Sequence, residues 1–98
     1  MDRRRTFIWD PRKAKSNLLK HGVSFVEATT VFFDPFPAIF SDRDHSESEE
    51  RWLLIGYSSG GLLLAVIFTE RGRFIRVISA RKATKREIQK HESEENKS

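Results

Sequence analysis

The pattern of apolar and polar positions predicts a short strand and two helices in the first third of the chain. Residues 6–9 favour a strand, and Asp10-Pro11 follows with a helix cap and a proline at the first helical position. We expect this helix to end near His21, before Gly22. Its expected buried stripe is Ala14, Leu18, Leu19 and His21.

A second helix is predicted over residues 24–32, because Ser24 and Glu27 have the spacing of a capping box. Its expected inward side chains are Phe25, Ala28, Val31 and Phe32. The sequence Asp34-Pro35 should close it, since a residue that precedes proline leaves the helical region.

The remaining two thirds predict four strands and a last helix. Residues 37–41 favour an edge strand because of their proline, and residues 42–50 a charged loop. Residues 52–57 and 62–68 favour a hairpin, and the second run is apolar throughout, which is typical of a central strand. A further strand begins near Phe74, and a capping box at Thr84 predicts a helix to about residue 92.

This order, β-α-α-β-β-β-β-α, predicts an α+β fold with a mostly antiparallel sheet, two N-terminal helices and one C-terminal helix. We expect a single domain over residues 1–98, ordered over about 6–92, with a disordered tail at 93–98.

The composition limits the cellular compartments and the kinds of chemistry that we expect for this protein. The 98 residues include no cysteine, which excludes disulfides and thiolate zinc sites. No apolar run is long enough to span a membrane, and the basic N-terminus lacks the apolar region of a signal peptide. The spacing of the three histidines fits no metal site, and we expect no cofactor. We therefore expect a cytoplasmic protein that does not bind membranes.

Charge is separated into blocks along the chain. Residues 1–24 carry a net charge of +5, residues 25–50 carry −6, residues 51–91 carry +7 and residues 92–98 carry −2. This separation indicates a basic face that suits an anionic polymer and an acidic face that would repel it or bind a basic protein.

The strand near Phe74 carries Arg76 and Arg81 on either side of apolar residues. Guanidinium is costly to desolvate without a partner, so a stiff strand bearing two arginines indicates a site for an anion such as phosphate. The alternative is that both arginines are ordinary solvated residues. Because their positions differ in parity, a regular strand would point them to opposite faces unless a bulge intervenes.

Other candidates are spread along the chain, and each has a purely solvated or structural alternative. His45 in the charged loop is a candidate general acid or base, with Arg51 as a further phosphate clamp and Glu49 or Glu50 to orient the imidazole. Lys13 and Lys20 add charge from the first helix. Trp9 either staples that helix to the core or stacks on an unpaired base. Arg71 and Arg73 flank the turn before the arginine strand and could extend a track of contacts to a nucleic-acid backbone, and Lys82 is a further candidate for such binding.

With these residues assembled, the chain resembles the BrnT family of bacterial toxins over about residues 7–91. The first matching pieces are Phe7-Ile8-Trp9-Asp10-Pro11, Lys13, Asn17, Lys20-His21-Gly22-Val23-Ser24-Phe25, Ala28, Phe32 and Asp34-Pro35. The others are Asp42, Asp44-His45-Ser46, Glu50-Arg51, Gly56, Thr69-Glu70-Arg71 and Arg76-Val77-Ile78-Ser79-Ala80-Arg81-Lys82-Ala83-Thr84. One departure is His91, where the family commonly has tyrosine.

The resemblance implies a fold similar to the RelE class and an endoribonuclease toxin that cuts RNA and stops translation. It also implies a ribbon-helix-helix antitoxin, BrnA, in a 2:2 complex that binds operator DNA through the antitoxin. The antitoxin could cover the basic site directly or attach along an exposed strand edge.

Our hypothesis is metal-independent cleavage, in which Arg76, Arg81 and Arg51 stabilise the phosphoryl oxygens, His45 transfers protons and Lys13 assists through its charge. The alternatives are a non-catalytic nucleic-acid-binding module and a protein whose basic surface only docks an acidic partner.

Overall fold

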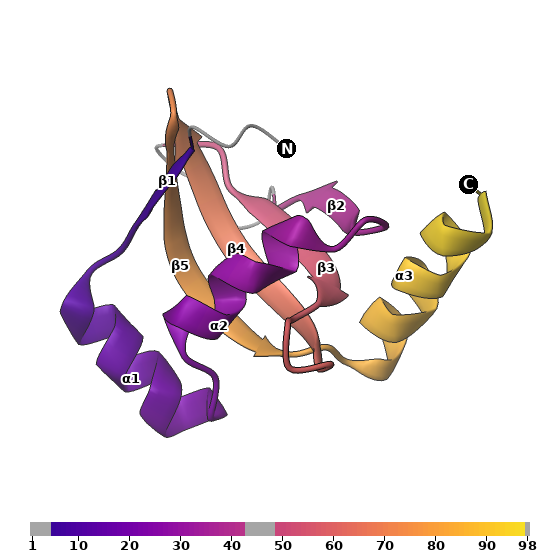
Figure 1. Cartoon of the computed structure of the whole chain (residues 1–98), viewed down its shortest axis with the longest axis horizontal. Helices are drawn as coiled ribbons and strands as arrows, with labels where there is room; N and C mark the ends of the chain where they lie inside the picture. The colour runs from indigo at the N-terminus through magenta and orange to yellow at the C-terminus, as the bar shows by residue number, and fades with distance from the viewer. Residues whose placement is uncertain (1–4, 43–48, 98) are drawn as a thin grey trace.

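One five-stranded sheet organises the chain (Figure 1). A computed structural model describes residues 5–42 and 49–97. The elements are β1 (Thr6–Ile8), α1 (Pro11–His21), α2 (Phe25–Thr30), a 3-10 turn η1 (Val31–Phe33), β2 (Ala38–Ser41), β3 (Trp52–Tyr57), β4 (Leu63–Arg71), β5 (Phe74–Lys82) and α3 (Lys85–Lys97). The predicted order of strands and helices and the α+β class are confirmed.

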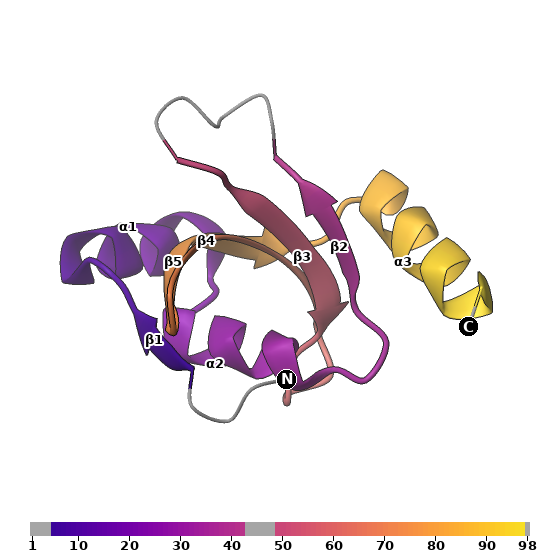
Figure 2. The same cartoon turned by 90° about the horizontal axis from the view of Figure 1, so that it is seen from above.

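The strands lie in the order β1-β5-β4-β3-β2, so the apolar strand β4 is central and β2 is an edge, as predicted. All neighbours are antiparallel except β1, which pairs parallel with β5. Figure 2 shows α2 beneath the curved sheet, with α1 and α3 at opposite ends. Helix α1 packs on β5, whereas α3 packs on β2 and β3.

Helix α1 begins and ends where the sequence predicts. The Asp10 side chain accepts a hydrogen bond from the backbone N–H of Arg12, and Gly22 adopts a left-handed φ of 71° after the last turn. The predicted buried stripe was wrong at Leu18 and Leu19, which are 50% and 80% exposed.

Asn17 is the buried residue of α1 instead. Its amide nitrogen donates to the carbonyls of Val23 at 2.9 Å and Ala80 at 2.7 Å, and its oxygen accepts from the N–H of Ala80 at 3.1 Å. The two bonds to Ala80 join the helix to β5 through polar groups, so Asn17 rather than Leu18 or Leu19 faces the sheet.

The core lies between the sheet and the two N-terminal helices. All four predicted inward residues of α2 and η1 are buried: Phe25, Ala28, Val31 and Phe32. The Phe32 ring packs edge-on against Phe68 of β4 at a centroid distance of 4.9 Å. Aromatic rings supply much of the apolar area that a chain of this length can bury.

Helix α3 begins at the predicted capping box. The Thr84 hydroxyl accepts from the N–H of Glu87 at 3.2 Å, and the Glu87 carboxylate accepts from the N–H of Thr84 at 2.8 Å. The helix continues to Lys97, beyond the expected end near residue 92.

We expect Asn17→Ala to lower the free energy of unfolding by about 2–4 kcal/mol, because it leaves buried backbone groups of Ala80 and Val23 without partners. Urea denaturation measures the change. Ser16→Ala, on the exposed side of the same helix, should change stability by no more than about 0.5 kcal/mol. Equal stability of the two variants would contradict the structural role of Asn17.

Candidate active site

The sheet has one face covered by α1 and α2. The opposite face, which we call the open face, is contacted by α3 at its β2–β3 end. Core residues Leu64, Val66 and Phe68 fix the covered side of β4, so Ala65, Ile67 and Thr69 point to the open face.

Both arginines of β5 lie on the open face. Cross-strand partners share a side, and Thr69 pairs with Arg76 while Ala65 pairs with Arg81. In a regular strand, Arg76 and Arg81 would point to opposite faces, but β5 contains a bulge. Ile67 pairs with Ser79 and the next residue, Phe68, pairs with Val77. Ile78 is therefore an extra residue that restores both arginines to the same face. Their partners Ala65 and Thr69 are four positions apart along β4, which places the backbones of the two arginines about 13 Å apart.

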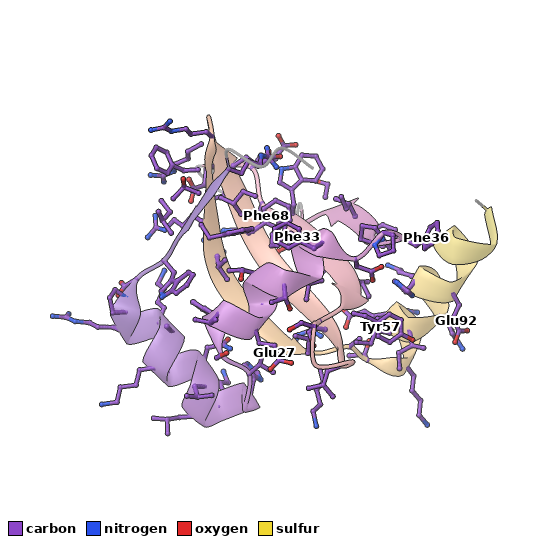
Figure 3. All side chains as sticks on the ribbon, in the orientation of Figure 1. Glu27, Phe33, Phe36, Tyr57, Phe68 and Glu92 are labelled. Carbon is purple, nitrogen blue, oxygen red and sulfur yellow. The ribbon has the colours of Figure 1, made fainter. Side chains whose placement is uncertain are left out.

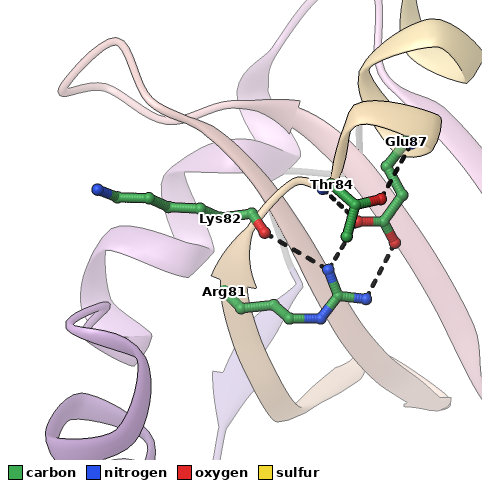
Figure 4. Close-up of polar contacts among 4 residues, drawn as sticks. All are labelled: Arg81, Lys82, Thr84 and Glu87. Atoms are coloured by element: carbon green, nitrogen blue, oxygen red, sulfur yellow. Dashed lines mark hydrogen bonds and ion pairs between the residues drawn. The ribbon is translucent and has the colours of Figure 1, made fainter.

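Arg81 is held by α3 (Figure 4). Its Nη1 and Nη2 donate to the two carboxylate oxygens of Glu87 at 2.6 and 3.0 Å. This hydrogen bonding raises the pKa of Arg81, and the charge of Asp42 acts in the same direction. Burial alone would raise the pKa of Glu87, but the bonds from Arg81 and from the Thr84 backbone outweigh burial and lower it.

A second group of arginines surrounds Glu49. Arg71 donates to Glu49 Oε2 from Nη2 at 2.6 Å and from Nε at 3.2 Å. The pKa of Glu49 is lowered, first by this hydrogen bonding and then by the charges of Arg71, Arg76 and Arg51. One carboxylate therefore lies within the electrostatic reach of three guanidinium groups, which we call the arginine cluster (Arg51, Arg71 and Arg76).

The backbone explains why these residues meet. The buried Thr69 hydroxyl donates to the carbonyl of Glu50 at 2.8 Å, which fixes the segment before β3 against β4. The β3–β4 register pairs Trp52 with Phe68. Arg51 precedes Trp52 and Thr69 follows Phe68 on the antiparallel strand, so Arg51 lies level with Thr69. Thr69 in turn pairs with Arg76. The segment just before β3 and strand β5 thus each contribute one arginine of the cluster, on either side of Thr69 in β4.

Two predicted lysines lie elsewhere. Lys13 and Lys20 are exposed on α1, which packs on the helix-covered side of β5 through Asn17. The outer surface of α1 has a shallow groove between Arg12, Lys15, Leu19 and Lys20. The structure therefore does not bring Lys13 or Lys20 to the arginine cluster.

Trp9 packs edge-on against Phe25 of α2 at a centroid distance of 6.0 Å and is partly buried against the core. Arg73 lies 5.6 Å from the ring centroid of Phe74, and Lys82 is exposed at the end of β5. His45 lies outside the described residues.

His91 of α3 is buried, with 2% of its side chain exposed, and its Nε2 lies 3.6 Å from Asp34 Oδ2. Its ring meets Tyr57 edge-on at a centroid distance of 5.4 Å. These contacts place His91 in the packing between α3 and the sheet, on the end of β3 opposite Arg51.

Sequence reasoning missed the roles of Thr69 and Glu87. The capping box predicted that Glu87 caps the start of a helix, but only the fold shows that the same carboxylate binds Arg81. Among the described residues, no group of three histidine, aspartate or glutamate side chains could hold a metal ion. In the same part of the chain, no helix is both long and apolar enough to cross a bilayer.

Comparison with known proteins identifies the family to which the chain belongs. The model of a family described as "Ribonuclease toxin, BrnT, of type II toxin-antitoxin system" matches residues 9–87. The 1.1 Å crystal structure of the Brucella abortus ribonuclease toxin BrnT is similar, with a TM-score of 0.63 and 28% sequence identity over 83% of this chain and 99% of that chain. Comparison with curated protein sequences gives no significant match.

Fold and family match together define a ribonuclease toxin of a type II toxin–antitoxin system. Within that class, the chain belongs to the BrnT family. An antitoxin partner and an RNA substrate follow from this class.

We expect Glu87→Gln to lower the free energy of unfolding at pH 7 by about 1–2 kcal/mol, because it weakens both the helix cap and the bond to Arg81. The loss of stability stays modest because water reaches the Arg81–Glu87 ion pair, in which the side chain of Arg81 is 36% exposed.

The pH dependence of this effect has a defined sign. The pKa of Glu87 is lowered in the folded protein, so its contribution is full above the ordinary glutamate pKa and is lost as the pH falls below it. Urea denaturation between pH 7 and pH 3 should show the parent and Glu87→Gln converging in acid. Glu92→Gln on the exposed side of α3 is the control, and a pH-independent difference would contradict the assignment.

Proposed function

We propose that this toxin is an endoribonuclease that cleaves RNA without a metal ion, by attack of a ribose 2′-oxygen on the adjacent phosphorus. The observation that carries the proposal is the arginine cluster around Glu49 on the open face. Guanidinium groups hold phosphoryl oxygens with paired hydrogen bonds, and their charge stabilises a transition state that is more anionic than the substrate.

The reaction balances without a cofactor. The 2′-oxygen forms a bond to phosphorus as the bond to the 5′-oxygen breaks, which leaves a cyclic phosphate and a free 5′-hydroxyl. One group removes the 2′-hydroxyl proton, and another returns a proton to the leaving oxygen. On sequence grounds His45 is our candidate for proton transfer.

We assign the arginines to charge stabilisation. Arg76 and Arg51 lie level on the open face and would bind the scissile phosphate, whereas Arg81, tied to Glu87, would act from further along β5. Arg71, Arg73 and Lys82 would contact flanking phosphates. Lys13, Lys20 and Trp9 would bind RNA only where a longer strand passes over α1.

Glu49 is unsuited to be the general base, because a carboxylate with a lowered pKa is a weak proton acceptor near neutral pH. We infer that it occupies the place of a phosphate in the free protein. RNA must then compete with this carboxylate for Arg71.

We expect Arg76→Ala to lower the rate of RNA cleavage by about 10²–10³-fold, the usual effect of removing one charge-stabilising group. Arg81→Ala should also lower it. The assay follows a defined RNA in the presence of EDTA and identifies cyclic-phosphate ends. Arg86→Ala, an exposed arginine on α3, should cleave like the parent.

Cleavage by both Arg76→Ala and Arg81→Ala at the parental rate would refute the assignment. RNA that stays intact but binds with steep salt dependence would instead favour a non-catalytic binding module. Loss of activity in EDTA that returns with a divalent cation would refute metal independence.

We expect Glu49→Gln to raise the affinity for RNA by several-fold at low salt, because it frees Arg71 and removes a negative charge from the arginine cluster. Fluorescence anisotropy with a labelled RNA, in the Arg76→Ala background to prevent cleavage, measures the change. Glu92→Gln, which removes an exposed carboxylate from α3, is the control. If Glu49→Gln bound RNA no more tightly than the parent, the inference that Glu49 occupies the place of a phosphate would be contradicted.

The finer features of the partner system are also proposals. We propose that the antitoxin is a BrnA-like ribbon-helix-helix protein, that it forms a 2:2 complex, and that the complex binds operator DNA in the cytoplasm. The family membership supports these features, and a likeness to the RelE class stays a prediction. The mass of the complex in solution tests the stoichiometry.

A further inference from the structure

Several large apolar side chains are exposed where η1 turns into β2. Phe33 is 66% exposed, Phe36 is 51% exposed and Tyr57, at the end of β3, is 49% exposed. Together with Pro35 they form what we call the aromatic face. Figure 3 shows Phe33, Phe36 and Tyr57 in the region between α2 and α3. Clustered exposed aromatic rings commonly mark a protein interaction site.

The aromatic face is held rigidly by a carboxylate that is itself buried. Asp34, with 6% of its side chain exposed, accepts from the N–H of Tyr57 at 2.7 Å and from the N–H of Phe36 at 2.9 Å. The approach is so close that a Cβ at Gly56 would lie 2.9 Å from Asp34 Oδ2. A surface ordered in advance loses little conformational entropy when a partner binds.

A groove of about 450 Å³ runs between these side chains. Its lining includes Phe33, Pro35 and Tyr57 together with the polar residues Thr30 and Ser58. A groove with aromatic walls and polar groups at its base can receive apolar side chains from a partner and fix their orientation.

The charge around the groove selects among possible occupants. Among the residues that the structure describes, its lining includes Asp34 and no lysine or arginine, and Ser58 donates to a second carboxylate, Glu27, at 2.8 Å. RNA phosphates would be repelled here. A second copy of the chain, related by a two-fold axis, would bring the same carboxylates towards one another.

We propose that the aromatic face is a docking site for the antitoxin, and that it receives a segment with apolar side chains flanked by lysine or arginine. The inference rests on membership of a type II toxin family and not on the proposed cleavage chemistry. The proposal places part of the antitoxin contact away from the arginine cluster. Binding of the antitoxin and masking of the arginine cluster would then be separable.

The test compares Phe33→Ser/Phe36→Ser with Leu19→Ser, which removes an 80% exposed leucine from α1. Affinity for the purified antitoxin is measured by titration calorimetry, and RNA cleavage by each free variant is measured in parallel. We expect the double variant to bind the antitoxin at least about 10-fold more weakly, as at an interface hot spot. Leu19→Ser should bind like the parent, and all variants should cleave RNA equally.

Because both phenylalanines are largely exposed, the double variant should melt like the parent, and Phe36→Ser alone provides a milder second variant. Hydrogen exchange of residues 33–36 should slow in the complex. Unchanged affinity of the double variant would overturn the proposal, as would weaker binding of Leu19→Ser alone. A parental toxin that is dimeric until Phe33 and Phe36 are replaced would assign the face to a second copy. A fall in RNA cleavage by the double variant would assign it to the substrate.

Discussion

The alternation of side chains along a strand is the constraint on which the candidate active site depends. Arg76 and Arg81 are five residues apart, so an uninterrupted strand would direct one of them into the helix-covered side. The extra residue at Ile78 shifts the register once, and both arginines then point to the open face. Core positions confirm the shift, since the buried residues of β5 are Ile75, Val77 and Ala80 rather than every second residue.

Carboxylates control where the guanidinium groups of this face point. Glu87 holds Arg81, and Glu49 holds Arg71 within reach of Arg51 and Arg76. Such pairs preorganise cations that would otherwise sample many rotamers, but they also occupy hydrogen-bond donors that a phosphate would use. The basic face is therefore built with internal anions, and in the mechanism we propose RNA would exchange places with these carboxylates rather than fill empty positions.

Local signals predicted most of the fold, because caps, prolines and apolar runs act over a few residues. The Asp10 cap, the buried face of α2 and the capping box at Thr84 are examples. Sequence could not show that Asn17 rather than Leu18 faces the core, since its partner Ala80 is 63 residues away. The same limit applied to the site: arginines were predicted as phosphate ligands, but the contact between Thr69 and Glu50 that gathers them exists only in the assembled sheet.

The pairing of the first strand with the last has a consequence for how the toxin is made. Thr6 pairs with Phe74 and Ile8 with Arg76, so β1 has no partner until β5 has been synthesised. The central strand β4 likewise lacks one neighbour until then. A growing chain on the ribosome therefore cannot complete the sheet, and the arginine cluster cannot form, before β5 has been translated.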